Sequence, residues 1–417
     1  MIYRIIGVSI IILLLELYFY NSITTLLKSS SERIKKKVKW VYLSFTFLLI
    51  IFVLAAIIIP FKDWPKIIRV YLSSFIFIIM ISKLIGSIFL LADDLIRLVK
   101  MIYKWFRQIF KINHKDSDDV NEKISRQKFF SIAGVIFSTF TFAPLFYGMV
   151  KGAFSYKIRT EKLSFPNLPI SFKGLKIIQI SDIHTGSFIS TEPLTKAIEL
   201  IQAQNADLIF FTGDLVNDKT EEVIPFLDIL SKIKAPMGVY SILGNHDYGD
   251  YPRWDSKEEK LENFHQMIET HKKLGWHLLR NENIILEKGN DKIALIGVEN
   301  WGGKLGFPKY GNIDKAISGT EDYIFKILLS HDPTHWDMKI KEHYPDIDLT
   351  LSGHTHGMQF GVEIPGFRWS PSQYIFKQWA GLYKHNSQYI YVNRGLGFLG
   401  YAGRVGILPE ITVIELT

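Results

Sequence analysis

Four long apolar runs in the first third of the chain constrain its fold more than any other feature. The runs cover residues 5–20, 40–60, 67–91 and 129–150, and the second and fourth contain no charged side chain. A helix needs about 20 apolar residues to cross a bilayer core of ~30 Å. Helices of soluble proteins carry a polar stripe, which these runs lack. We therefore predict a four-helix transmembrane module in residues 1–152.

The first run does not have the form of a cleaved signal peptide. Arg4 precedes it, but Glu16 interrupts it and no small-residue cleavage site follows. Charged residues inside spans mark transport pathways. Only Glu16, Arg69 and Lys83 lie within these runs, and we expect the two cations to reach the membrane interface with their long side chains. Transport is therefore not the predicted function.

The distribution of positive charge predicts the orientation. Residues 1–152 hold 21 Lys/Arg and 9 Asp/Glu, whereas residues 153–417 hold 28 and 32. Most of the basic residues before position 153 lie between the first and second runs and between the third and fourth. Such segments stay in the cytoplasm, so residues 153–417 are expected on the extracytoplasmic side of a cytoplasmic (inner) membrane. Segment 95–111 is either an amphipathic interface helix or an extension of the third span.

The second part, residues 153–417, is predicted to be an α/β domain. Helices are expected at 192–204, 221–232 and 257–274, the last with Ser256 and Glu259 as a capping box. The chain has no Cys, which excludes disulfides, thiol catalysis and Cys-ligated metals. Short apolar runs read as strands at 175–181, 208–212, 239–243, 293–298, 327–330, 349–352, 389–392 and 411–415.

Potential metal ligands follow five of these expected strands. In an open α/β sheet, ligands bind beyond the carboxyl ends of the strands, so these side chains should converge on one crevice. Oxygen and imidazole ligands suit Mn, Fe, Zn or Co. Two neighbouring ions need a bridging carboxylate, for which Asp214 is the natural candidate. The five clusters read Ser181-Asp182-Ile183-His184, Gly213-Asp214, Gly244-Asn245-His246-Asp247, Ser330-His331-Asp332-Pro333 and Gly353-His354-Thr355-His356-Gly357.

The order of these motifs (DxH, GD, GNHD, H, GHTH) resembles the calcineurin-like metallophosphoesterase superfamily over about residues 175–417. The run from Gly353 to Gln359 is similar to a bacterial membrane-associated phosphodiesterase branch, in which GHTHGGQ is usual, but Met358 replaces the second glycine. The resemblance implies a four-layer α/β/β/α sandwich, with two mixed β-sheets face to face and helices outside. It also implies hydrolysis of a phosphate ester by a metal-activated hydroxide.

The same resemblance implies a role for each motif residue. His246 would stabilise charge on the phosphate or protonate the leaving group. Asp247 would orient the His246 ring through its other nitrogen. Two divalent metal ions are implied, the first held by Asp182, His184, Asp214 and His356, and the second by Asp214, Asn245, His331 and His354.

The substrate is less constrained by the sequence. A phosphodiester, a phosphomonoester or a pyrophosphate, lipid-linked or not, fits a hydrolase tethered to a bilayer. Arg253 and Arg394 are candidate substrate-binding residues, the alternative for Arg394 being an ion pair with a carboxylate. The slightly acidic domain lacks a basic groove, which excludes long nucleic acid as a partner. The alternative function is a catalytically silent membrane sensor or scaffold that binds metal or a phospholigand.

Overall fold

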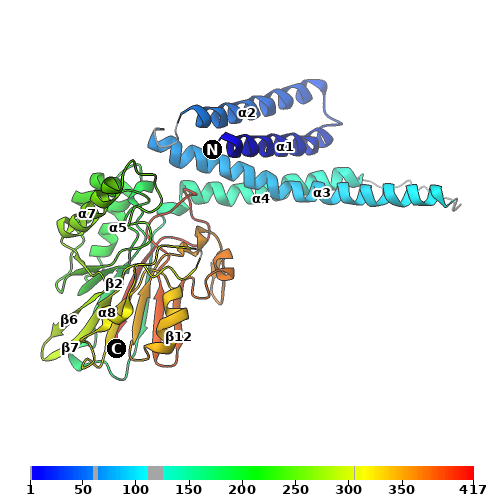
Figure 1. Ribbon diagram of the computed structural model, residues 1–417. Helices are drawn as coiled ribbons and strands as arrows, with labels where there is room; N and C mark the ends of the chain where they lie inside the picture. Colours follow the sequence, from blue (N-terminus) through cyan, green and yellow to red (C-terminus); the bar gives the residue numbers. More distant parts are fainter. Residues whose placement is uncertain (1, 60–63, 111–124, 305) are drawn as a thin grey trace. The chain divides into compact units, whose positions relative to one another are not determined.

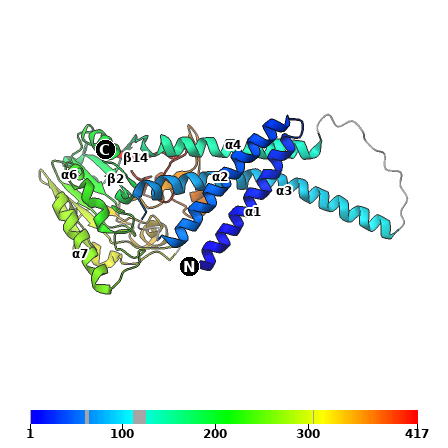
Figure 2. The same ribbon diagram turned by 90° about the horizontal axis from the view of Figure 1, so that it is seen from above.

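The computed structural model describes residues 2–59, 64–110, 125–304 and 306–417 (Figures 1 and 2). The chain divides into two compact units, Met1–Tyr147 and Gly148–Thr417. The first consists of helices and the second contains all of the strands that the structure describes. Each unit has its own contacts and is described separately.

The four predicted membrane helices are present, and each is long and apolar enough to cross a bilayer. All four extend beyond the apolar runs because their polar flanks are also helical. A π-helical turn, Ile68–Leu72, leads into α3. Helix α3 runs without a break to Ile109, so segment 95–109 extends the third span and is not a separate interface helix. The helices are α1 (Ile2–Leu26), α2 (Glu32–Ile58), α3 (Ser73–Ile109) and α4 (Arg126–Val150).

A buried ion pair joins α1 to α3. Lys83 is only 9% exposed, and its Nζ lies 2.6 and 2.7 Å from the two carboxylate oxygens of Glu16, which is fully buried. Thr46 of α2 donates a hydrogen bond of 3.0 Å to the same carboxylate. The expectation that Lys83 reaches the membrane interface is therefore wrong. An anionic partner lies within the helix bundle, and pairing with it offsets the cost of burying the ammonium group.

The second unit contains two mixed six-stranded sheets, as predicted. The first has the order β1-β14-β2-β3-β4-β5, in which β14 is antiparallel to β2 and parallel to β1. The second has the order β12-β13-β9-β8-β7-β6, with a parallel centre and an antiparallel pair at each edge. Strands of the first sheet are β1 (Lys157–Leu163), β2 (Lys176–Ile180), β3 (Leu208–Phe211), β4 (Val239–Ser241), β5 (His277–Leu278) and β14 (Glu410–Leu416). Strands of the second are β6 (Glu282–Lys288), β7 (Asp291–Gly297), β8 (Lys326–Leu329), β9 (Leu349–Ser352), β12 (Gly381–His385) and β13 (Gln388–Val392).

The two sheets pack face to face, with helices on their outer faces. Successive side chains of a strand point to opposite faces, so Ile177 enters the core between the sheets and Ile178 enters the core under the helices. Helices α5 (Glu192–Gln202) and α7 (Lys257–Leu274) cover the first sheet (Figure 1). Helix α8 (Ile313–Ile317) and the turns around Trp336 cover the second. This arrangement is the predicted four-layer sandwich.

Local differences from the sequence reading have physical causes. Residues 221–232 do not form one helix: a 3₁₀ segment, Thr220–Phe226, precedes the short α6 (Leu227–Leu230). Pro225 lacks an N–H and cannot join the ladder of an α-helix. Helix α7 has the predicted bounds, and Ser256 Oγ accepts from the Glu259 N–H at 3.1 Å. The Glu259 carboxylate, however, accepts from the N–H of Asp255, one residue before the position that a capping box requires.

Candidate metal and catalytic centre

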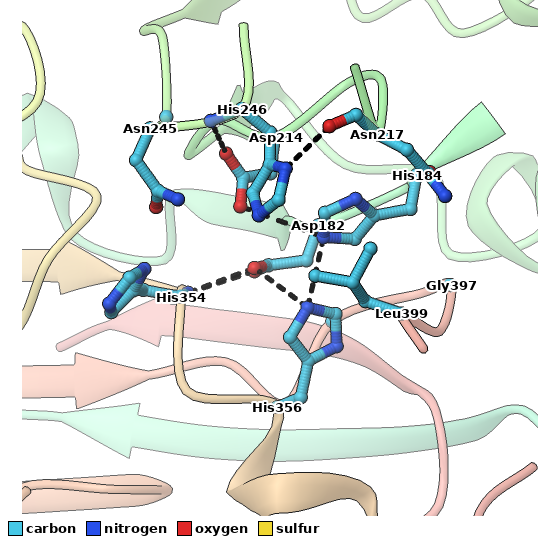
Figure 3. A network of polar contacts seen from close by, with 12 residues as sticks. Asp182, His184, Asp214, Asn217, Asn245, His246, His354, His356, Gly397 and Leu399 are labelled. Atoms are coloured by element: carbon cyan, nitrogen blue, oxygen red, sulfur yellow. Dashed lines mark hydrogen bonds and ion pairs between the residues drawn. The ribbon is translucent and has the colours of Figure 1, made fainter. Parts of the chain in front are cut away.

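The five sequence clusters meet at the carboxyl ends of the central strands, and Figure 3 shows labelled side chains of four of them. The first sheet contributes the residues that follow β2, β3 and β4, and the second sheet those that follow β8 and β9. Within each sheet these strands run parallel, so their carboxyl ends lie along one edge. The loops after these five strands therefore place side chains from both sheets beside one another.

Six of the seven predicted ligands form two groups of three. In each group the potential ligand atoms all lie within 4.8 Å of one another. The seventh, Asn245, offers an amide oxygen in place of an imidazole or a carboxylate. This Oδ1 is buried and has no hydrogen-bond partner among the described residues. Its Nδ2 donates to the Tyr251 hydroxyl at 2.7 Å, which directs the amide and leaves Oδ1 free. The groups are Asp182, His184 and His356, and Asp214, His331 and His354.

The distances within the cluster suit two cations. His184 Nε2 and His356 Nε2 lie 3.0 Å apart, so two ring nitrogens face the same point. Asp214 Oδ2 lies 3.2 Å from His331 Nε2 and 3.6 Å from His184 Nε2, and thus faces both groups. His354 Nδ1 lies 3.3 Å from His331 Nε2, so these two ring nitrogens also face each other within the second group. Buried polar atoms are normally satisfied, and a cation satisfies each of these nitrogen and oxygen donors.

Burial sets the charge state of the cluster. It lowers the pKa of His184 to about 3 and that of His354 to about 4, which keeps both rings neutral with a free lone pair. Burial raises the pKa of Asp182 to about 6. For Asp214 the effect of burial is outweighed by the nearby charges of His331 and His246, and its pKa falls well below the usual range. Burial opposes protonation of His331, but the neighbouring Asp214 carboxylate raises its pKa to about 10. The neutral rings of His184 and His354 and the ionised Asp214 carboxylate are donors that suit a divalent metal ion, which would take the place of the proton on His331.

Five of the predicted ligands have a left-handed backbone conformation. This region is uncommon for residues other than glycine, and each instance costs about 1–3 kcal/mol. Tight neighbours hold the loops in place: a Cβ on Gly353 would lie 2.3 Å from Asp182 Oδ2, and one on Gly397 would lie 1.9 Å from the Ile183 carbonyl. The surrounding fold therefore imposes the geometry of the site. The φ values are 50° at Asp182, 50° at His184, 61° at Asp214, 73° at His354 and 48° at His356.

His246 lies at the mouth of the cluster, and its ring is fixed by the main chain. Its Nδ1 is 2.5 Å from the Asn217 carbonyl oxygen, so Nδ1 carries the proton and Nε2 keeps its lone pair. Its own N–H donates to Asp214 Oδ1 at 2.9 Å. The ring centroid is 4.6 Å from that of Tyr251. These contacts leave Nε2 as the ring nitrogen available for proton transfer.

The predicted role of Asp247 is wrong. Its carboxylate does not orient the His246 ring, a task that the Asn217 carbonyl performs. It instead accepts the backbone N–H groups of Asp214 and Gly244 at 2.9 Å and of Leu215 at 2.8 Å. Asp247 therefore joins the loops after β3 and β4, and acts on the centre by positioning Asp214.

The two predicted substrate-binding arginines lie in different surroundings. Arg394 is 1% exposed and pairs with the carboxylates of Glu410 and Glu363, so the prediction that it binds substrate is wrong and the ion-pair alternative is correct. Arg253 is exposed on the loop after His246 and stays a prediction. Sequence reasoning missed Arg404, which is buried with Nη2 3.1 Å from His356 Nδ1. Burial lowers the pKa of Arg404 to about 10.

Comparisons with known proteins agree with the geometry. Residues 3–153 match the family described as "Probable Calcineurin-like phosphoesterase, transmembrane domain", and residues 175–358 match "Calcineurin-like phosphoesterase". The chain is 32% identical to the metallophosphoesterase YkuE of Bacillus subtilis (strain 168) over 71% of its own length and 98% of that protein.

Two further relatives have more specific names. A zebrafish (Danio rerio) protein named "Transmembrane protein with metallophosphoesterase domain" is 31% identical, and the match covers 65% of this chain and 59% of that protein. The chain thus spans about three fifths of that relative's length. Phosphodiesterase YaeI of Escherichia coli (strain K12) is 29% identical over 58% of this chain and 82% of the relative. The chain belongs to the calcineurin-like metallophosphoesterase family, whose members are hydrolases acting on ester bonds, and it carries a transmembrane domain of that family.

Proposed function

We propose that this protein is a membrane-anchored phosphodiesterase that requires two divalent metal ions. The observation that carries the proposal is the pair of ligand groups, because Asp214 Oδ2 lies close to a histidine of each group. Asp182, His184, Asp214 and His356 would hold one ion, and Asp214, Asn245, His331 and His354 the other. The name of the relative YaeI favours a diester over a monoester or a pyrophosphate.

The residues of the chain have distinct tasks in the proposed reaction. When bound, two divalent ions supply neutralisation of the phosphate oxygens and a water of lowered pKa as nucleophile. Asp214 keeps the two ligand groups together. His246 Nε2 would first accept a proton from water and then pass it to the leaving oxygen, while the Asn217 carbonyl holds the other proton on Nδ1. The half-buried position of His246 places Nε2 where a substrate has access to it.

Location and charge support the remaining parts of the proposal. The basic segments between the helices favour an extracytoplasmic catalytic domain. A hydrolase held beside the bilayer has ready access to phosphates on lipids or lipid-linked precursors. We therefore include a lipid-linked phosphodiester among the candidate substrates, with Mn, Fe, Zn and Co as candidate metals.

The test uses the full chain in detergent, stripped of metal and then loaded with each candidate ion. The assay compares hydrolysis of bis(nitrophenyl) phosphate with that of nitrophenyl phosphate and of a phospholipid in mixed micelles. We expect metal-dependent cleavage of the diester. His246→Ala should lower kcat by ~10²–10⁴-fold, the usual contribution of a general acid or base. Asp214→Ala should lose activity and bound metal together.

His265→Ala is the matched control, because His265 is exposed on α7, away from the cluster. It should leave turnover and metal content unchanged. Metal binding without hydrolysis of any of the three substrates would reject the phosphodiesterase and support the sensor or scaffold instead. Equal activity of His246→Ala and the parent protein would reject the proton-transfer role of that residue.

A further inference from the structure

An exposed apolar face lies directly beside the candidate centre. Residues 358–364 alternate strictly: Met358, Phe360, Val362 and Ile364 are exposed, while the residues between them are buried or half-buried. The run begins two residues after the ligand His356. Its last part, β10 (Val362–Ile364), pairs with β11 (Phe367–Trp369) in an isolated two-stranded hairpin. Ile364 is 58% exposed and its cross-strand partner Phe367 is 54% exposed.

The polarity of this hairpin is reversed relative to a soluble surface. Its charged residues point into the domain: Glu363 accepts from Arg394 at 2.7 Å and from Arg159 at 2.5 Å. The Arg368 guanidinium lies over the ring of Trp379, 5.1 Å from its centroid. Antiparallel strands in water normally place apolar residues inward and polar residues outward. An ordered hairpin with the opposite arrangement is suited to an apolar environment.

Residues 404–405 form hydrogen bonds both to the base of the hairpin and to the last turn of α4. Arg404 N–H donates to the Gly148 carbonyl in the last turn of α4 at 3.1 Å. The next residue, Val405, donates to the Gln359 carbonyl at 2.8 Å and accepts from the Gly361 N–H at 2.9 Å. These contacts all lie within the unit Gly148–Thr417. The base of the hairpin is therefore linked to the end of α4, a helix long and apolar enough to cross a bilayer, within a single compact unit.

We propose that the face formed by Met358, Phe360, Val362, Ile364 and Phe367 inserts into the interfacial layer of the phospholipid bilayer. Three residues per strand extend about 10 Å. This length matches the ~5–10 Å to which apolar faces enter the boundary between head groups and acyl chains. Insertion holds the mouth of the centre at the depth of the head groups. If the proposed function holds, the substrate is therefore a phosphate at the membrane surface.

The absence of Cys from the chain allows a direct test of insertion. Ile364→Cys and Phe367→Cys are labelled with an environment-sensitive fluorophore in the full protein, which is then reconstituted in phosphatidylcholine vesicles. Lipids with a spin label near the head group quench a fluorophore at the interface, and iodide quenches one in water. We expect lipid quenching at 364 and 367 to exceed that at a control position several-fold, with protection from iodide.

Two control positions define the signal expected in water and the signal expected in lipid. Ile324→Cys is an exposed apolar site on the same domain, before β8, and should respond to iodide. Phe140→Cys is an exposed site within α4 and should respond to lipid quenchers. A labelled variant that loses the thermal transition of the parent protein is replaced by Val362→Cys.

Two outcomes would overturn the inference. In the first, labels at 364 and 367 respond to iodide as the label at 324 does. In the second, they are protected from both quenchers and the protection disappears at high lipid-to-protein ratio, which identifies a second copy of the chain as the partner of this face. No step of the test measures hydrolysis. An inactive protein with lipid-quenched labels would reject the proposed phosphodiesterase and leave membrane insertion standing.

Discussion

His246 and Asp247 are adjacent in the sequence, but their side chains serve different loops. The His246 ring contacts the Asn217 carbonyl, while the Asp247 carboxylate gathers the N–H groups at the ends of β3 and β4. The first contact prepares a ring nitrogen for proton transfer. The second maintains the backbone from which Asp214 projects. Substitutions at the two positions should therefore have different consequences.

Asp247→Asn should destabilise the protein even without metal. The amide nitrogen that replaces one carboxylate oxygen would face N–H donors, leaving at least one buried donor unsatisfied at a cost of about 1–3 kcal/mol. His246→Asn, at the half-buried mouth, should leave stability close to that of the parent protein. Thermal unfolding of the metal-free full chain in detergent distinguishes the two. Equal melting temperatures for the two variants would show that Asp247 does not support the loops.

The residues that sequence reasoning placed correctly are those whose side chains form a pattern after strands. Asp182 and His184 stand in such a pattern, and the structure brings both into one group. Asn217 contributes a main-chain carbonyl, which leaves no trace in the sequence. The environment of Arg394 depends on Glu363 and Glu410, which only the folded chain brings near.

Among the elements, α1 and α3 are joined by the Glu16–Lys83 pair. Lys83→Met should leave the buried Glu16 carboxylate without a cation and destabilise the helix bundle by about 3–5 kcal/mol. The double variant Glu16→Leu/Lys83→Met removes both charges and should recover most of that loss. Unfolding of the four proteins of this cycle in mixed micelles measures the coupling. Additive effects of the two single substitutions would show that the pair contributes no interaction of its own.

Helix α7 makes the stability of the domain depend on pH through His271. This ring is fully buried, with Nδ1 2.9 Å from Ser241 Oγ of β4, and burial lowers its pKa to about 3. In the unfolded chain the His271 ring binds a proton below about pH 6.5, whereas in the folded chain it stays neutral until a much lower pH. Stability from this group is therefore full above about pH 6.5 and falls as pH decreases toward 3, by up to ~1.4 kcal/mol per pH unit.

His271→Asn removes this titration while keeping a polar side chain. The variant should lose less stability than the parent protein between pH 7 and pH 5. Denaturant unfolding at both pH values provides the comparison. If both proteins lose the same stability between pH 7 and pH 5, His271 does not cause the loss. Another buried histidine present in both, such as His335, whose pKa burial also lowers to about 3, would then be responsible.

Among the helices and strands, those that are buried were easier to predict from the sequence than those that are exposed. Strand β3 is buried on both faces, reads as a continuous apolar run and begins at the predicted residue, Leu208. Strand β1 is largely exposed and rich in charge, so no apolar run marks it. The hairpin β10–β11 was missed because a charged residue stands in the middle of each three-residue strand, so no apolar run marks it. The 3₁₀ segment at Thr220 differs from an α-helix through one proline.

For the whole molecule, the distribution of Lys and Arg predicts the side of the membrane. A Cys at His265, exposed on the catalytic domain, should react with an impermeant maleimide added outside intact cells or spheroplasts. A Cys at Arg33, exposed at the start of α2, should react only after permeabilisation. Both begin from a chain without Cys, so each signal has one source. The reverse pattern would place the catalytic domain in the cytoplasm.

The order of strands in the first sheet has a consequence for the synthesis of the protein. Strand β1 follows the last membrane helix directly, yet its neighbour in the sheet is β14, which also separates it from β2. β14 leaves the ribosome after every residue of the candidate centre. Until then β1 has no strand to pair with, and the sheet stays open beside β2. A nascent chain interrupted before Glu410 would thus hold all of its ligands, anchored in the bilayer, without the strand that closes the sheet, and would be a substrate for membrane proteases.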